Sequence, residues 1–374
     1  IAGDQADCES MYALKKLMES LESTNIDCRQ DGAAIGEGSR AGYLFNSTIA
    51  GIEEADAILI VGANPRLESP VLNARIRKRF LGGNVSIGVI GEETDLTYRY
   101  DYLGAGPNTL ADIASGSNSF AQVLKDATNP MIIIGSGVLT RDDGAAVLGT
   151  ARKIAEATGM ISGGWNGFNV LHTAASRVGG LDLGFVPGES GAGTAEILSG
   201  GMDVVYLLGA DEIDMNGLGD AFVIYQGHPG DAGAHRADVI LPGAAYTEKN
   251  ATYVNTEGRV QQGRLATFPP GEAREDWTIL RAFSEVLGNT LPFDRLGDVR
   301  ARMAKISTSF ETVDSVTPAA WDDFGTTGDL SGGAFSGAVD DFYLTDVISR
   351  ASHTMAQCSG LFVTGQQGKT GTDG

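Results

Sequence analysis

The segment GIEEADAILIVGANPRLESPVLNARIRK, residues 51–78, contains the unit that decides the fold. Its run AILIV is apolar at every position, as strands of parallel sheets covered on both faces require. Gly62 then allows a tight turn, and a segment of helical length follows. The segment GGMDVVYLLGADE, residues 200–212, has the same arrangement. The repetition indicates two related α/β domains.

Short apolar runs that end at a glycine recur along the chain. Strands that alternate with helix-length segments are typical of βαβ units and doubly wound sheets. Glycine is frequent, at 52 of 374 residues, which fits many tight strand-to-helix turns. We therefore predict an α/β fold of two doubly wound, mostly parallel-sheet, Rossmann-like domains with an irregular C-terminal tail. The predicted strands are Ala57–Gly62, Val85–Gly91, Met131–Gly135, Val204–Gly209, Phe222–Gly227 and Asp238–Gly243.

The two ends of the sequence differ from its middle. Residues 1–21, IAGDQADCESMYALKKLMESL, predict the end of a strand, a glycine turn and a helix capped by Asp7. Because a domain should not begin on the end of a strand, we expect this chain to continue a longer polypeptide. Residues 326–341, rich in Gly and Ser, predict a linker, and residues 342–362 predict one amphipathic helix. The last residues, TGQQGKTGTDG, predict no regular structure.

The net charge of −21 excludes several classes of function. A field of that sign repels nucleic acid and anionic lipid, and it favours solubility or basic protein partners. The longest apolar runs are strand-sized, so we expect no direct membrane insertion. One compact basic run, Arg75 with Arg77, Lys78 and Arg79, has two interpretations. It is either a solvated helix end whose cations complement the helix dipole, or a docking patch for an acidic partner.

No motif in the sequence defines a catalytic or metal-binding site. Cys8, Cys28 and Cys358 are too far apart for a zinc or iron–sulfur motif, and we expect structural or free thiols. His228 and His235 are interpreted as loop residues. GSGVLT, residues 135–140, predicts a tight turn rather than an anion site, because a third glycine is missing. The residues alone therefore predict an acidic α/β protein without a self-sufficient active site.

The stretch HRADVILPGAAYTEKNATYVNTEGRVQQ, residues 235–262, leaves two possibilities open. Its polar side chains either hold a ligand or form the framework of the fold. With YALKKLMESLESTNIDCRQDG, residues 12–32, and ADAILIVGANPRLESPVLNARIRK, residues 55–78, it resembles the α/β region of the molybdopterin-dependent oxidoreductases. That superfamily includes formate dehydrogenases and nitrate reductases.

The resemblance is closer to a branch that does not use the cofactor, the large iron–sulfur subunits of respiratory complex I. It extends over nearly the whole chain, and it implies a structural part of an electron-transferring subunit of a proton-pumping NADH:quinone oxidoreductase. The segments that carry it are NSTIAGIEEADAILIVGANPR, DLTYRYDYLG, IYQGHPGDAGAHRADVILPGAAYTEKNATYVNTEGR and DFYLTDVISRASHTMAQC.

The same resemblance implies that molybdopterin is absent. Active members of the superfamily ligate molybdenum through a Cys, selenocysteine or Ser, and here that position falls near Ala33, which cannot coordinate a metal. Cys28 is the nearest possible ligand and is interpreted as a structural thiol. The pterin-binding segment falls near residues 163–180, which keep Asn166 and Asn169.

By this resemblance we expect no catalytic residue and no metal ligand in the chain. The [4Fe-4S] and [2Fe-2S] clusters are expected upstream of Ile1. A relict cofactor pocket would use residues at strand ends and in the polar stretch, where Glu248, Asn255, Glu257 and Arg259 are predicted to hydrogen-bond locally. The candidates for this relict pocket are Asn64, Gly209, Asp211, Glu248, Asn255 and Arg259.

The resemblance also implies an organisation and a setting. One α/β domain, residues 1–35 and 159–300, is interrupted by a second, residues 36–158, and residues 301–374 form a C-terminal linker and helix. The implied partners are other peripheral-arm subunits, including the flavin-bearing NADH-site subunit and neighbouring iron–sulfur subunits. The implied location is peripheral on the inner membrane, facing the bacterial cytoplasm or the mitochondrial matrix. The alternatives are an active formate dehydrogenase-like molybdopterin enzyme, or a relict pocket that binds a nucleotide or structural ion.

Overall fold

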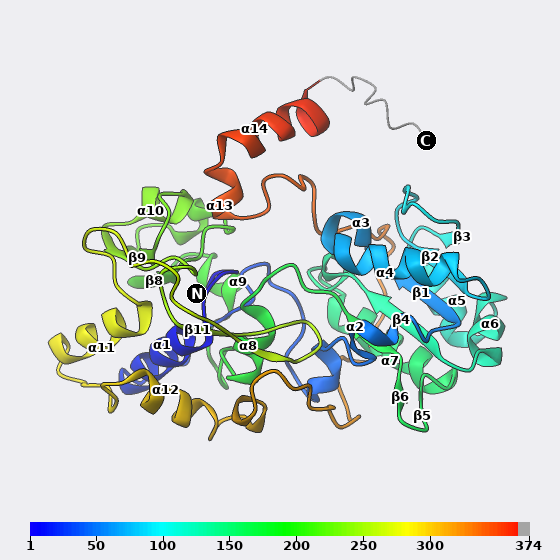
Figure 1. Ribbon diagram of the computed structural model, residues 1–374, viewed down its shortest axis with the longest axis horizontal. Coiled ribbons are helices and arrows are strands. Elements are labelled where there is room, and N and C mark those ends of the chain that lie inside the picture. Colours follow the sequence, from blue (N-terminus) through cyan, green and yellow to red (C-terminus); the bar gives the residue numbers. More distant parts are fainter. Residues whose placement is uncertain (366–374) are drawn as a thin grey trace.

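The computed structural model describes residues 1–365 and shows two lobes side by side, each built around a parallel sheet (Figure 1). The larger sheet has the order β3-β2-β1-β4-β7, and all of its strands are parallel. β1 lies at its centre, and all five of its residues are buried. The strands are β1 Ala57–Val61, β2 Ser86–Ile90, β3 Asp101–Gly104, β4 Pro130–Ile134 and β7 Phe168–Val170.

Helices cover both faces of this sheet. Alternate residues of β1 point to opposite faces: Ile58 and Ile60 pack in the cluster that contains α4, whereas Leu59 and Val61 pack with α5, α6 and α7. This double burial explains why the strand is apolar at every position. The helices of this lobe are α2 Thr48–Gly51, α3 Pro65–Glu68, α4 Pro70–Leu81, α5 Pro107–Ser115, α6 Phe120–Asp126 and α7 Gly144–Ala157.

The second sheet has the order β10-β9-β8, again parallel, with β8 Val204–Leu208, β9 Phe222–Gly227 and β10 Val239–Pro242. Ala2 pairs with Leu208 in the parallel sense, so the first residues lie beside β8 as the predicted strand end. Helix α1, Cys8–Ser20, begins as predicted, because the Asp7 carboxylate accepts the Ser10 backbone N–H at 2.8 Å. Helices α8 Arg177–Asp182, α11 Asp276–Val286 and α12 Leu296–Met303 pack against α1.

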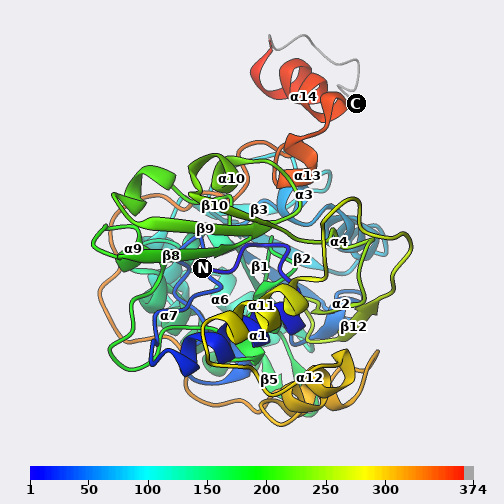
Figure 2. The same ribbon diagram turned by 90° about the vertical axis from the view of Figure 1, so that its left-hand side faces the viewer.

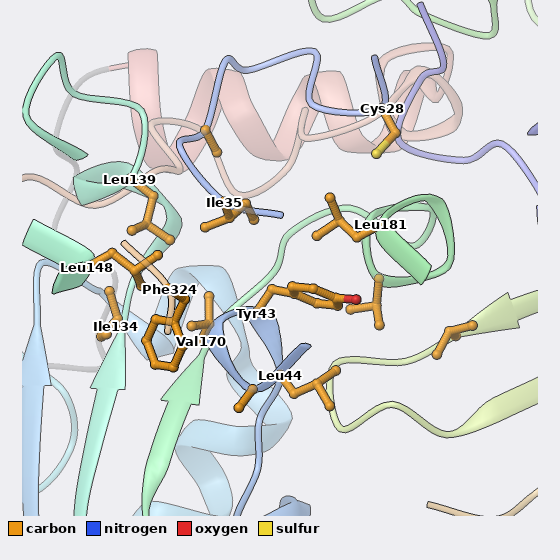
Figure 3. Close-up of a cluster of buried hydrophobic side chains, with 14 of the residues drawn as sticks. Cys28, Ile35, Tyr43, Leu44, Ile134, Leu139, Leu148, Val170, Leu181 and Phe324 are labelled. Carbon is orange, nitrogen blue, oxygen red and sulfur yellow. The ribbon is translucent and has the colours of Figure 1, made fainter. Parts of the chain in front are cut away.

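A continuous hydrophobic core joins the two lobes. In Figure 3, Ile134 and Val170 of the larger sheet lie on one side of this core, with Leu181 of α8 and Cys28 on the other. Phe324, from the C-terminal part of the chain, is buried among them, and its ring packs at a tilt against that of Phe168 with centroids 5.0 Å apart. The remaining short elements are η1 Arg40–Tyr43, η2 Ser136–Val138, β5 Ile161–Ser162, β6 Trp165–Asn166, α9 Thr194–Ile197, η3 Met215–Leu218, α10 Ala232–Arg236, β11 Ala251–Val254, β12 Val260–Gly263 and η4 Thr308–Glu311.

The six predicted strands are confirmed, but the expected helix after each strand is not. After β2 the chain enters a loop and then β3, and after β10 it enters a loop that leads to the antiparallel β11–β12 hairpin. The domain division at residues 35–36 and 158–159 stays a prediction. Strand β7, which lies beyond residue 158, pairs with β4 in the larger sheet.

One prediction for the C-terminal part was wrong. Residues 326–341 form no helix or strand, as a linker would, and they pack along the larger lobe. Residues 342–362 do not form the single helix that we predicted. Helix α13 covers Val347–Arg350 and helix α14 covers His353–Ser359. Between them Ser352 has an extended backbone, and its side chain caps the start of α14. A π-type turn, η5 Gly360–Thr364, follows α14. The segment that contains α13 and α14 projects away from the two lobes (Figure 1). Residues 366–374 of the predicted unstructured tail lie outside the described residues.

The basic run ends a helix, as one interpretation predicted. Arg79 donates to the carbonyls of Gly83 and Asn84 beyond the end of α4, and Arg75 and Lys78 both pair with Glu53. Within residues 1–365, no helix is both long and apolar enough to cross a bilayer.

Candidate functional site

A ligand crevice is expected where the order of the larger sheet reverses. The chain progresses from β1 to β2 and β3 in one direction, and to β4 and β7 in the other. In open parallel sheets, ligands bind outside the carboxyl ends of the two strands at such a point. Here these ends are the turns after β1, at Gly62, and after β4, at Gly135.

The crevice is filled by the chain itself. Residues 331–338, called the strap below, lie across the two turns. Phe335 is only 1% exposed, and its backbone N–H donates to the carbonyl of Ala105 at 2.8 Å. A Cβ on Gly137 would lie 2.5 Å from the Ser336 carbonyl oxygen, so the missing side chain of Gly137 leaves room that the strap occupies. A Cβ on Gly62 would lie 1.9 Å from Val138 Cγ1 and 3.2 Å from Phe335 Cβ, so Gly62 makes room for Val138 and the strap.

Polar contacts fasten the strap to the loop before α7. Arg141 donates to the carbonyls of Gly333 and Ala334, and its guanidinium lies 5.2 Å from the centre of the Phe335 ring. Asp143 accepts the Ser331 backbone N–H at 2.7 Å and pairs with Arg141 at 2.7 Å. The Arg141 hydrogen bond, with those from Ser331, lowers the pKa of Asp143 to about 2. Asp143 is thus ionised at neutral pH and holds the strap as an acceptor.

After β1, the carboxylate of Glu68 lies where a bound anion would contact the backbone N–H groups of the turn. The backbone N–H of Asn64 donates to Glu68 Oε1 at 2.6 Å. Burial raises the pKa of Glu68, while the backbone N–H groups of Asn64, Ala338 and Ser136 favour its ionised form. Amide groups at such turns are the usual phosphate donors, and here they face the protein's own side chain.

At the equivalent edge of the smaller sheet lies a small cavity of about 30 Å³, enough for about one water molecule. Gly209 follows β8 with a φ of 59°, a conformation that favours glycine. Asp211 accepts the Tyr225 hydroxyl at 2.7 Å and the Gly233 backbone N–H at 2.8 Å, so its carboxylate is held by the fold. Burial raises the pKa of Asp211.

A buried lysine lies at the wall of this cavity between two carboxylates. Lys249 Nζ is 2.7 Å from Asp7 and 2.5 Å from Asp276. Burial alone would lower the pKa of Lys249, but the carboxylates of Asp276 and Asp7 outweigh it and raise that pKa well above its usual value. The ammonium is therefore fixed in an ion-pair network that joins α1, α11 and the loop after β10.

The polar stretch that left two possibilities open forms framework contacts. Glu248 accepts the Ala245 backbone N–H at 3.0 Å, and Asn255 accepts the Arg259 backbone N–H at 2.9 Å across the β11–β12 turn. Arg259 pairs with Glu257 at 2.9 Å, and Glu257 also accepts the backbone N–H of Ile49 at 2.8 Å. These contacts match the predicted local hydrogen bonding and add one that joins the hairpin to α2.

A larger cavity, of about 780 Å³, lies between the lobes and beside the strap. Burial raises the pKa of Asp4 in its wall to about 6. Among the described residues, the only cation in the lining is Arg350, which is already paired with Glu212 at 2.6 Å and Asp231 at 2.7 Å. The acidic residues that line the cavity are Asp4, Asp31, Glu212, Asp340, Asp341 and Asp346.

The structure places the predicted metal-ligand position and the nearest thiol in packed surroundings. Ala33 is buried, and its backbone N–H donates to Asp31 at 3.1 Å. Cys28 is a free, buried thiol packed against Gly180, and burial raises its pKa to about 12. Asn169 accepts the Ser47 backbone N–H at 3.0 Å, a framework role. Within residues 1–365, no group of three or more His, Cys, Asp or Glu side chains is placed to hold a metal ion.

The six candidates for the relict pocket do not come together in one place. Asn64 lies at the strap, Gly209 and Asp211 at the end of β8, and Glu248 in the loop after β10. Asn255 and Arg259 lie at the β11–β12 turn, and the pocket they were to form stays a prediction. Sequence reasoning missed the strap and the pairing of Lys249. A single phenylalanine, Phe335, within a Gly/Ser-rich run was the one available signal for the strap.

Known proteins match most of the chain. The molybdopterin oxidoreductase family model matches residues 1–286, and a second model, which describes the C-terminal part of an NADH-ubiquinone oxidoreductase subunit, matches residues 312–358. The chain is 43% identical to mitochondrial NADH dehydrogenase (ubiquinone) iron-sulfur protein 1 of Solanum tuberosum, covering 96% of this chain and 49% of the relative.

Two further relatives are also similar to this chain over nearly its whole length and over about half of their own. The mitochondrial 78 kDa subunit of NADH-ubiquinone oxidoreductase from Neurospora crassa is 45% identical, over 98% of this chain and 50% of the relative. The 75 kDa subunit of NADH-ubiquinone oxidoreductase from Reclinomonas americana is 40% identical, over 97% of this chain and 55% of the relative. The chain thus spans about half the length of the curated relatives it matches.

Proposed function

Because this chain belongs to the molybdopterin oxidoreductase family, with a sequence similar over nearly its whole length to complex I iron–sulfur subunits, we propose that it is a cofactor-free structural region of such a subunit. The whole subunit would carry electrons in a proton-pumping NADH:quinone oxidoreductase. This region would support the cluster-bearing part and present packing surfaces to other subunits.

The observation that carries this proposal is the strap in the sheet crevice. A pterin dinucleotide needs the carboxyl edge of a doubly wound sheet, and there Phe335 and Ser336 contact the turns at Gly62 and Gly137. Glu68 takes the Asn64 backbone N–H that would face a phosphate. The residues present therefore do not fit that cofactor.

The inter-lobe cavity gives independent support. The pyrophosphate groups of a pterin dinucleotide are anionic, and the six acidic residues of the cavity lining would repel them at short range. Its one described lining cation, Arg350, is already paired with two carboxylates. At the position expected for a molybdenum ligand, Ala33 offers no donor side chain.

The finer assignments are part of the same proposal. The [4Fe-4S] and [2Fe-2S] clusters would lie in the half of the relatives that this chain does not span. The partners would be peripheral-arm subunits, including the flavin-bearing NADH-site subunit and neighbouring iron–sulfur subunits. The region would lie peripherally at the inner membrane, on the bacterial cytoplasmic or mitochondrial matrix side. The division into residues 1–35 with 159–300, 36–158 and 301–374 would describe its units.

Iron analysis tests the proposal. The full-length subunit, purified without oxygen, is expected to contain iron and sulfide and to give the electron paramagnetic resonance signals of reduced iron–sulfur clusters. This chain alone is expected to contain no iron, because Cys8 and Cys28 are buried and, within residues 1–365, no group of three or more His, Cys, Asp or Glu side chains is placed to hold a metal. Cys28→Ser in the full-length subunit serves as the matched control and should leave the iron content unchanged. A full-length subunit without iron would refute the proposal.

A further inference from the structure

One face of the smaller sheet is apolar and open over half of its length. The parallel register pairs Val204 with Phe222 and Ile224 with Val239, which places these side chains together on one face. Val204 is 58% exposed, Phe222 46% and Val239 39%. We call the surface formed by Val204, Phe222 and Val239 the open face; its strands lie at the left of Figure 1 and in the upper part of Figure 2.

The opposite face is covered over β8 and β9, where Val205, Val223 and Tyr225 are buried. On the edge strand β10 of that face, Ile240 is 53% exposed. On the same face as the open face, α11 covers the carboxyl half, where the rings of Tyr206 and Phe283 lie 6.3 Å apart. Parallel sheets occur with helices on both faces because their strands are apolar on both. The amino half of this face therefore lacks the cover that its side chains require.

The open face continues into an apolar hollow beside β8. This cavity, of about 70 Å³, is lined mainly by apolar side chains from α1, the first residue and β8, among them Leu14, Met18 and Val204. Ile1 borders it, and its amino group donates to the carbonyl of Tyr206 at 2.8 Å.

The path of the chain points to what covers this surface. Because Ala2 pairs with Leu208 in the parallel sense, a residue before Ile1 in a longer chain would lie beside β8 toward Val204. The relatives are about twice as long as this chain. A family model described as C-terminal matches residues 312–358 of this chain. From this match we infer that the half of the relatives that this chain does not span precedes the part equivalent to Ile1.

Resting on the proposed function, we propose that the open face is the docking surface for an amphipathic helix from the N-terminal half of the full-length subunit. The helix would enter the sheet through a strand that extends Ile1 along β8, and its apolar stripe would cover Val204, Phe222 and Val239. Asp203 and Asp220 are exposed at the amino ends of β8 and β9 and favour basic residues along the edges of that helix. The surface thus joins the scaffold to the part expected to bear the clusters.

Cysteine labelling tests this proposal. Phe222→Cys is introduced into a Cys358→Ser background, in this chain and in the full-length subunit, and its reaction with a fluorescent maleimide is timed. Cys8 and Cys28 are buried and give little background. Labelling at position 222 should be fast in this chain and at least about tenfold slower in the full-length subunit, because covered sites react only on local opening. Val71→Cys, where the native side chain is 75% exposed on α4, is the control and should react quickly in both.

Two results would overturn the proposal. The first is equal labelling of position 222 in the two proteins. The second is protection in this chain alone that grows with protein concentration, which would assign the open face to a second copy. Iron is measured on the same full-length sample. If iron is present while position 222 stays reactive, this inference fails and the proposed function stands; if iron is lacking, the proposed function itself fails.

Discussion

Lys249→Met is expected to lower the free energy of unfolding by about 3–5 kcal/mol near neutral pH, because removing one partner leaves buried charges without compensation. Lys249 Nζ contacts Asp7 and Asp276, and all three side chains are buried. Methionine has a similar length, so the variant removes the charge with little change in packing. Chemical denaturation measures the change. The matched control is Lys16→Met: Lys16 pairs with Glu19 at side-chain exposures of 32% and 44%, and the expected loss is below about 0.5 kcal/mol.

The pH dependence of Lys249→Met has a definite sign. Although burial acts against it, Lys249 lowers the pKa of Asp7, so the stability that Asp7 contributes is present above its unfolded pKa and is lost as pH falls through the folded value. Without Lys249, burial raises the pKa of Asp7, and the variant recovers stability when that carboxyl is protonated. The difference between the two proteins should therefore be larger at about pH 7.5 than at about pH 4.5. A constant difference across this range would show that the loss is one of packing.

Phe335→Ala is expected to lower the free energy of unfolding by about 3 kcal/mol, because it removes a fully buried ring and its contact with Arg141. Since Phe335 is the only buried residue of the strap, we also expect residues 331–338 to become sensitive to protease while the two sheets stay folded. Denaturation and limited proteolysis, with mass spectrometry of the fragments, measure both effects.

The control for this variant is Phe268→Ala, whose native side chain is 83% exposed, with an expected change within about 0.5 kcal/mol. If Phe335→Ala matched this control in stability and in protease resistance, the strap would not fill the crevice in solution. The strap would then no longer support the proposal that this region binds no cofactor.

The strands and the first helix could be predicted because their signals are local. Each residue of β1 is buried, and the strand is therefore apolar at every position of the run AILIV. Asp7 caps α1 by accepting a hydrogen bond from Ser10, only three residues further along the chain. The prediction of a single helix over residues 342–362 was wrong for a reason that is also local. Ser352 has an extended backbone and its side chain caps α14, so a new helix begins there although the amphipathic pattern continues through this residue.

The features that decide the candidate site are non-local and therefore escaped prediction. A Gly/Ser-rich run has the same composition whether it is free or docked. The strap is held by Arg141 and Asp143 and fits into space left by Gly137, and these residues lie about 190 to 200 positions earlier in the chain. Asp7, a partner of Lys249, lies 242 residues earlier in the sequence. The polar stretch after β10 suggested a ligand, yet its side chains are used by the hairpin and by α2.

The most direct test of the central claim, that this region holds no molybdopterin cofactor, is the molybdenum, tungsten and pterin content of the full-length subunit from cells supplied with molybdate. Elemental analysis by mass spectrometry measures the metals, and fluorescence of the oxidised pterin released by acid measures the organic part. With the crevice filled by Phe335 and the cavity lined by carboxylates, we predict both at background level in a sample that contains iron. Stoichiometric molybdenum or tungsten together with pterin would contradict the claim.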